Sequence, residues 1–164
     1  MKQGLTIVKL TEEKFDDFIH LIEKLAEYEK LDPPDDKAKI RLKKDGLSEN
    51  PKYEAYLGMV DGKAVAYIIF FMTYSSFLAL PTLYLEDIFV LKKYRRRGIG
   101  QKMFEFVIKQ AKERGCGRME WCILAWNKPA IKFYEKNKAK RLNWYFYRLT
   151  RDQIEKFPNI GPNI

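Results

Sequence analysis

The chain has 164 residues and a net charge of +9, with 46% hydrophobic and 15% aromatic residues, which favours a packed globular domain over a disordered chain. One histidine and two cysteines are too few for a zinc site of the Cys/His type, so we expect no metal. The longest apolar run, residues 64–74, is shorter than a membrane span of about 20 residues. No apolar signal segment follows Met1, and a soluble, cytoplasmic protein is therefore expected.

In chain order, alternating polar and apolar residues predict a strand over 5–10, and apolar residues at helical spacing predict a helix over 12–30. A short helix is expected over 37–45, and strands over 53–60 and 64–74 flank an Asp61-Gly62 turn. The remaining expected elements are a strand over 82–91, a helix over 98–113, a strand over 118–124, a helix over 129–136, a strand over 143–149 and a helical turn within 151–157. This order predicts a mixed α/β fold on a mainly antiparallel sheet with a parallel portion, in one domain over 1–157 followed by a loose tail over 158–164.

The most informative stretch is residues 94–101, Tyr-Arg-Arg-Arg-Gly-Ile-Gly-Gln, between an expected strand and an expected helix. The first turn of a helix presents unpaired backbone N–H groups, and glycines let an anion approach them, so this stretch predicts a phosphate-binding loop. A Walker loop would end in Gly-Lys-Ser/Thr, and a dinucleotide fingerprint would have a small residue in place of Met103, so both are disfavoured. The alternative is an exposed basic turn at the start of a helix.

Positive charge is concentrated in one part of the chain, because residues 92–141 contain 16 Lys and Arg against 4 Asp and Glu. Such a segment favours an anionic partner: a phosphate-rich cofactor, nucleic acid or an acidic membrane surface. The alternative is a solubilising lysine-rich surface. A nucleic-acid module is disfavoured because the aromatic residues near the arginines fall at helix or turn positions rather than on an exposed sheet.

The pattern R-x-x-G-x-G after the strand segment 85–90, together with residues 126–134 (Trp-Asn-Lys-Pro-Ala-Ile-Lys-Phe-Tyr), resembles the Gcn5-related N-acetyltransferase (GNAT) superfamily. Segments 25–29, 44–46, 50–53, 83–87 and 127–134 resemble its diamine (spermidine/spermine) acetyltransferase branch more closely. The resemblance implies a GNAT-like fold with a splayed pair of parallel strands and flanking helices. It also implies acetyl-coenzyme A as donor, a small cationic amine as acceptor, direct attack in a ternary complex and a homodimer.

The resemblance further implies which residues bind the donor. The pyrophosphate is expected on the backbone of Arg96, Arg97, Gly98, Ile99, Gly100 and Gln101, with Arg95 nearby. The pantetheine arm is expected along Ile88, Phe89 and Val90, with the N–H of Ile88 as oxyanion donor. Further contacts are expected from Asn127, Pro129 and Ala130.

Acetyl transfer needs an uncharged amine, and an alkyl ammonium keeps its proton up to about pH 10. The only histidine, His20, falls on the polar face of its helix, so acid–base work is left to carboxylates or tyrosines. Glu86 is the candidate base, through a water, and the resemblance assigns Asp87 to holding the substrate. Successive strand residues point to opposite faces, so both can serve one cleft only if the strand is bulged; the alternative is a polar strand edge. The resemblance makes Tyr134 the general acid, although its spacing also fits ordinary packing.

The residues expected to bind the acceptor amine match the branch only in part. Tyr28 and Glu29 match an amine-binding pair of the branch, and Trp144 matches an aromatic substrate contact. Two departures stand against these matches. Residues 74–77 lack the Asp and Trp of the polyamine enzymes, and Lys140 and Arg141 stand where the branch has acids. Glu120 could restore one negative charge. Spermidine, spermine or another diamine is expected, while thialysine, another lysine-like amine or a protein amine is the alternative. A regulatory protein that binds coenzyme A without turnover is a further possibility.

Overall fold

The computed structural model describes residues 4–158, which divide into two compact units, one ending at Cys122 and the other beginning at Ile123. The first unit holds a five-stranded sheet in the order β1-β2-β3-β4-β5. Its strands are β1 (Thr6–Lys9), β2 (Glu54–Val60), β3 (Lys63–Ser75), β4 (Leu80–Val90) and β5 (Arg118–Glu120). The first three pairings are antiparallel and β4–β5 is parallel, which confirms the predicted mixed sheet.

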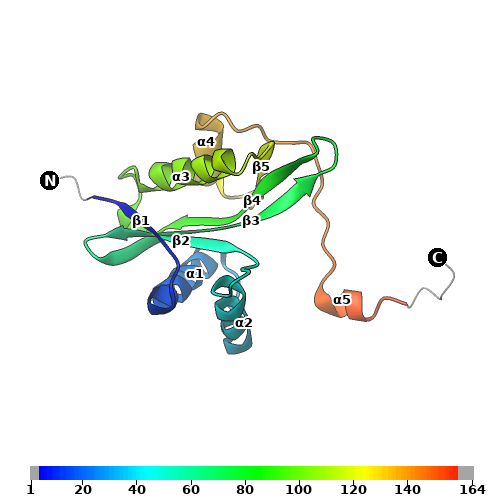
Figure 1. The fold of residues 1–164 in the computed structure, drawn as a ribbon, viewed down its shortest axis with the longest axis horizontal. Helices are drawn as coiled ribbons and strands as arrows, with labels where there is room; N and C mark the ends of the chain where they lie inside the picture. Colours follow the sequence, from blue (N-terminus) through cyan, green and yellow to red (C-terminus); the bar gives the residue numbers. More distant parts are fainter. Residues whose placement is uncertain (1–3, 159–164) are drawn as a thin grey trace. The chain divides into compact units, whose positions relative to one another are not determined.

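Helices cover both faces of this sheet (Figure 1), with α1 and α2 on one face and α3 on the other. The first unit contains the helices η1 (Glu12–Lys14), α1 (Phe15–Glu29), α2 (Asp36–Gly46), η2 (Lys92–Tyr94) and α3 (Ile99–Glu113). The second unit, taken by itself, contains α4 (Lys128–Lys136) and α5 (Arg151–Glu155). No helix among residues 4–158 is long and apolar enough to cross a membrane.

Helix α1 packs its apolar face against the sheet. Phe18 and Leu21 are fully buried, and the Phe18 ring meets the Tyr67 ring of β3 edge-on at 5.6 Å between centroids. His20 lies on the exposed face, as predicted. The buried stripe therefore positions the C-terminal end of α1, with Glu29, beside the sheet.

The Asp61-Gly62 turn joins β2 to β3 as predicted. Both residues have positive φ, 49° and 75°, which is the backbone of a two-residue hairpin turn that matches the twist of the strands.

One predicted strand is shorter than expected, and another does not form. The strand expected over 118–124 ends at Glu120, and the strand expected over 143–149 does not form, since those residues lie in no regular element. Alternation predicts an extended chain, but a strand exists only where a second strand accepts its hydrogen bonds. The helical turn within 151–157 is confirmed as α5, while the tail over 158–164 lies outside the described residues except for Pro158.

Candidate functional site

A β-bulge in β4 brings two acidic side chains to one pocket. Asp87 pairs with Ile69 and Leu85 pairs with Phe70, so Glu86 is an extra residue with no partner position on β3. In a regular strand Glu86 and Asp87 would face opposite sides of the sheet, whereas a bulge re-aims one of them. Both residues line the same pocket. The sequence predicts that Glu86 and Asp87 serve one cleft only if this strand is bulged, and the structure contains that bulge.

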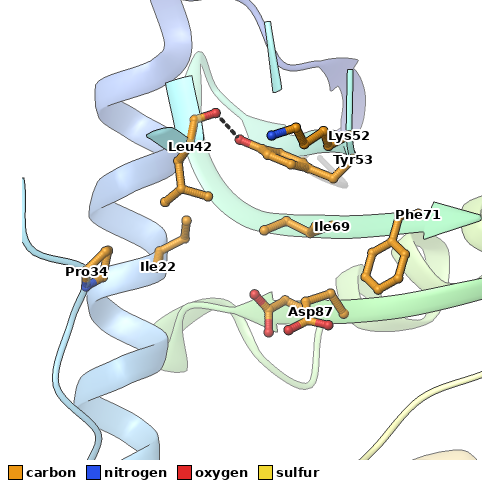
Figure 2. A pocket seen from close by; sticks show the side chains of 9 residues that line it. Ile22, Pro34, Leu42, Lys52, Tyr53, Ile69, Phe71 and Asp87 are labelled. Carbon is orange, nitrogen blue, oxygen red and sulfur yellow. Dashed lines mark hydrogen bonds between the residues drawn. The ribbon is translucent and has the colours of Figure 1, made fainter. Parts of the chain in front are cut away.

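The pocket has a volume of about 450 Å³ and lies wholly within the first unit (Figure 2). Its walls come from α1, the loop before α2, α2, the approach to β2, and the neighbouring strands β3 and β4. The lining residues are Ile22, Pro34, Leu42, Lys52, Tyr53, Ile69, Phe71, Glu86 and Asp87. Most of these side chains are apolar, so the few charged groups decide what binds.

The acidic end of the pocket is crowded with negative charge. Burial raises the pKa of Asp87 to about 6, and the negative charges of Glu86 and Glu29 add to the rise. The Tyr67 hydroxyl donates a hydrogen bond of 3.1 Å to the Asp87 carboxylate, which acts in the opposite direction. Burial also raises the pKa of Glu29. A cation bound here would relieve the repulsion among these carboxylates.

The structure separates Tyr28 from its predicted partner Glu29. The negative charge of Glu29 raises the pKa of Asp87. The Tyr28 ring instead packs against Arg95, whose guanidinium carbon lies 4.6 Å from the ring centroid. Arg95 also lies over the Phe89 ring at 5.4 Å, and its Nε donates to the Val90 carbonyl at 2.8 Å. Arg95 therefore ties the end of β4 to the end of α1.

Glu120, the other predicted acceptor residue of the first unit, lies on β5. Its carboxylate pairs with the Arg118 guanidinium at 3.1 Å, and it does not line the pocket.

The loop between β4 and α3 has the backbone of an anion site. Arg96 and Gly98 have positive φ, 60° and 81°, and no side chain caps the start of α3. The first helical hydrogen bond runs from the N–H of Lys102 to the carbonyl of Gly98, so the N–H groups of Ile99, Gly100 and Gln101 stand at the open end of the helix. This arrangement fits the pyrophosphate expected there.

Strand β4 has a free edge next to this loop. Its parallel pairing with β5 stops at Tyr84 opposite Glu120, whereas β4 continues to Val90. Residues 85–90 therefore have a strand partner only on the β3 side, within the described chain. An extended amide chain can add to such an edge, which fits the pantetheine arm expected along Ile88, Phe89 and Val90.

The second unit holds the other predicted site residues. The Asn127 side chain accepts a hydrogen bond from the N–H of Ala130 at 3.3 Å and caps α4, with Pro129 in the first turn. Tyr134 is buried, with its ring 5.2 Å from that of Phe133. Trp144 is 72% exposed and lies in no regular element.

Sequence reasoning assigned no role to Lys52, which lines the pocket, or to Tyr67, which donates a hydrogen bond to Asp87. Tyr67 lies inside the apolar run 64–74, where nothing marks it as the partner of Asp87. Lys52 stands in the Asn-Pro-Lys-Tyr segment that carries part of the family resemblance, but the segment alone assigns it no role.

A mixed sheet whose parallel pair parts beside a loop with an open helix N-terminus is the arrangement expected of a coenzyme A-dependent N-acyltransferase. The chain belongs to the Acetyltransferase (GNAT) family, whose model matches residues 15–138. The protein is thus an acetyl-CoA-dependent N-acetyltransferase, as the sequence predicted.

Named relatives are similar over much of the chain. The L-ornithine N5-acetyltransferase NATA1 of Arabidopsis thaliana is 40% identical over 69% of this chain, and the match spans 51% of that protein, about half its length. A thialysine N-epsilon-acetyltransferase of Sus scrofa is 32% identical, covering 84% of this chain and 88% of the relative. A human spermidine/spermine N(1)-acetyltransferase-like protein is 27% identical, covering 84% of this chain and 21% of the relative. The thialysine relative is therefore more similar than the member of the branch predicted from sequence.

Solved structures agree on the fold. An aminoglycoside N-acetyltransferase AAC(6')-Iy in complex with CoA has a TM-score of 0.76 at 18% identity, covering 92% of this chain and 97% of that one.

Proposed function

We propose that this enzyme acetylates the terminal primary amine of a small diamine-type acceptor, by direct attack on acetyl-CoA in a ternary complex. The observation that carries the proposal is the bulge that turns Glu86 and Asp87 into one pocket. One carboxylate can then hold an ammonium group while the other, more exposed one removes its proton.

The chain's own residues divide the work. Asp87, with its carboxylate fixed by Tyr67 and its charge crowded by Glu29 and Glu86, binds the ammonium form of the acceptor. Glu86 is exposed and takes the proton through a water. The backbone of the loop at 96–101 binds the pyrophosphate, and the free edge of β4 aligns the arm. Acetyl-CoA supplies the activated acetyl group.

Residues of the second unit complete the proposal. Tyr134 is proposed as the proton donor to the leaving sulfur, and Asn127, Pro129 and Ala130 as contacts of the arm, on the strength of the resemblance. The family model spans both units, which supports one catalytic domain over residues 1–157. A homodimer and roles for Tyr28 and Trp144 at the acceptor rest on the resemblance alone. The proposed cytoplasmic location rests on the sequence pattern, and the proposed role of Glu120 rests on its negative charge.

Two acceptor classes fit this site. Spermidine, spermine and shorter diamines carry the required terminal amine, and a spermidine/spermine relative supports them. Thialysine and lysine-like amino acids carry it too, and the ornithine and thialysine relatives support them.

A thiol-release assay with acetyl-CoA and a panel of these amines, beside calorimetric titration with coenzyme A, tests the proposal. Saturable turnover with a small amine supports it. Coenzyme A binding without turnover on any amine would instead indicate a regulatory protein, and the absence of binding would remove the loop assignment.

A further inference from the structure

The pocket carries opposite charges at its two ends. Glu86 and Asp87 form the anionic end on β4, and Lys52 lines the opposite side at the approach to β2. Figure 2 shows Lys52 and Asp87 on either side of Ile69. The side chains between them, Ile22, Leu42, Ile69 and Phe71, are apolar.

The sheet separates the two ends by a definite span. Ala55 pairs with Ile69 and Ile69 pairs with Asp87, so β2 and β4 lie two strand spacings apart, about 10 Å. Lys52 lies three residues before Ala55 and is therefore also displaced along the strand direction. The pocket thus fits an elongated molecule with a charged group at each end and a hydrocarbon chain between.

The Lys52 side chain is 74% exposed, pairs with Asp45 and still has donors to offer. Its backbone N–H donates to the Asp45 carbonyl and its Nζ lies 2.9 Å from Asp45 Oδ1. An ammonium has three N–H donors, so one bond to Asp45 leaves two. The neighbouring wall is held by Tyr53, whose hydroxyl donates to the Leu42 carbonyl at 2.6 Å.

We propose that Lys52 is a specificity-determining residue that binds the α-carboxylate of a diamino acid whose terminal amine lies at Glu86 and Asp87. The inference rests on the proposed function and chooses between its two acceptor classes. A carboxylate at Lys52 gains a charge-assisted hydrogen bond, whereas a diamine carries the same two amines without the carboxylate and cannot make this contact. Asp45, ion-paired with Lys52, provides an acceptor for the α-amino group beside that carboxylate.

Pairs of acceptors that differ only by the carboxylate test this assignment. Thiol release is measured with lysine against cadaverine and with ornithine against putrescine, each at several concentrations. For the parent enzyme we expect kcat/KM to be higher for the amino acid of each pair by about tenfold or more, the effect of one charge-assisted hydrogen bond.

Lys52→Met keeps the aliphatic stem and removes the charge. We expect it to raise KM for the amino acids, lower KM for the diamines and leave kcat nearly unchanged, so that the preference disappears. Lys52→Arg should retain most of the preference. Lys109→Met removes an exposed lysine of α3 that pairs with Glu113, and should leave both acceptor classes unaffected.

The outcomes distinguish failure of the Lys52 assignment from failure of the proposed acetyltransferase function. Equal or better use of the diamines by the parent enzyme, or an equal loss for both acceptor classes in Lys52→Met, overturns the inference and leaves the acetyltransferase intact. Absence of turnover with both members of every pair overturns the inference, and absence of turnover with spermidine, spermine and thialysine as well overturns the proposed function.

Discussion

Tyr67 and Asp87 are joined across neighbouring strands by a hydrogen bond of 3.1 Å, from the hydroxyl to the carboxylate. The Tyr67 side chain is fully buried against the Phe18 and Phe89 rings, so its hydroxyl has little freedom to move. The bond therefore fixes the direction of a carboxylate that burial and two neighbouring acids destabilise in its charged form.

Asp87→Asn is expected to stabilise the protein at neutral pH while lowering turnover. The pKa of Asp87 is about 6 in the folded chain against an ordinary 3.8, so the folded state binds more protons between these values. The free energy of unfolding of the parent thus falls as pH rises from about 4 to 6, and the amide avoids that loss. We expect a gain on the order of 1–2 kcal/mol at pH 7.5 that vanishes below about pH 4.

Thermal unfolding at the two pH values measures this difference. Asp17→Asn, which removes an exposed carboxylate of α1, is the matched control for the loss of one negative charge. A destabilised Asp87→Asn at pH 7.5 would mean that the carboxylate is held by a partner that the amide cannot replace.

Glu86→Gln should lower turnover most at low pH, where uncharged amine is scarcest. The loss should shrink as pH approaches the acceptor's own pKa near 10, with a maximum in the general-base range of about 10²–10⁴-fold. The measurement is kcat/KM over a pH series with one amine. A loss of equal size at every pH would show that Glu86 holds the substrate and does not deprotonate it.

Gly98→Ala should weaken acetyl-CoA binding through the backbone. Gly98 has φ of +81°, and beyond its chain neighbours no atom lies within 4 Å of the place that a Cβ would take, so the substitution strains the loop without a steric clash. We expect KM for acetyl-CoA to rise by about tenfold, with a stability loss of about 1–2 kcal/mol.

Gly62→Ala provides the matched comparison, because Gly62 has a similar φ of +75°, open space around it, and a place in the β2–β3 turn. It should lose comparable stability with an unchanged KM. Parental affinity for coenzyme A in Gly98→Ala would contradict the assignment of the loop.

Tyr134→Phe keeps a buried ring and removes one hydroxyl. If the hydroxyl protonates the leaving sulfur, turnover should fall by about a hundredfold while coenzyme A affinity and the Tm stay nearly unchanged. Tyr147→Phe, which alters a tyrosine that is 87% exposed, should have no effect. Parental turnover would assign Tyr134 to packing, and a large fall in Tm would make its hydroxyl structural.

Local pattern was sufficient to predict most of the elements from the sequence. The helical stripe of α1, the Asp61-Gly62 turn, and the start of α3 after Gly98 follow from spacing and backbone preference within a few residues. The motif at 94–101 likewise predicts an anion site, because the N-terminus of a helix binds anions through its own backbone.

Pairing between distant residues was decided only by the tertiary structure. The bulge at Glu86 depends on how β4 aligns with β3, and alternation within β4 cannot reveal a register shift. The prediction of a strand over 143–149 was wrong for the same reason, because the alternation of its own residues does not show whether a second strand lies beside it. Lys52 and Asp87 lie on opposite sides of one pocket because two intervening strand pairings place them there. Side chains 35 positions apart come to line the same pocket only when the sheet has formed.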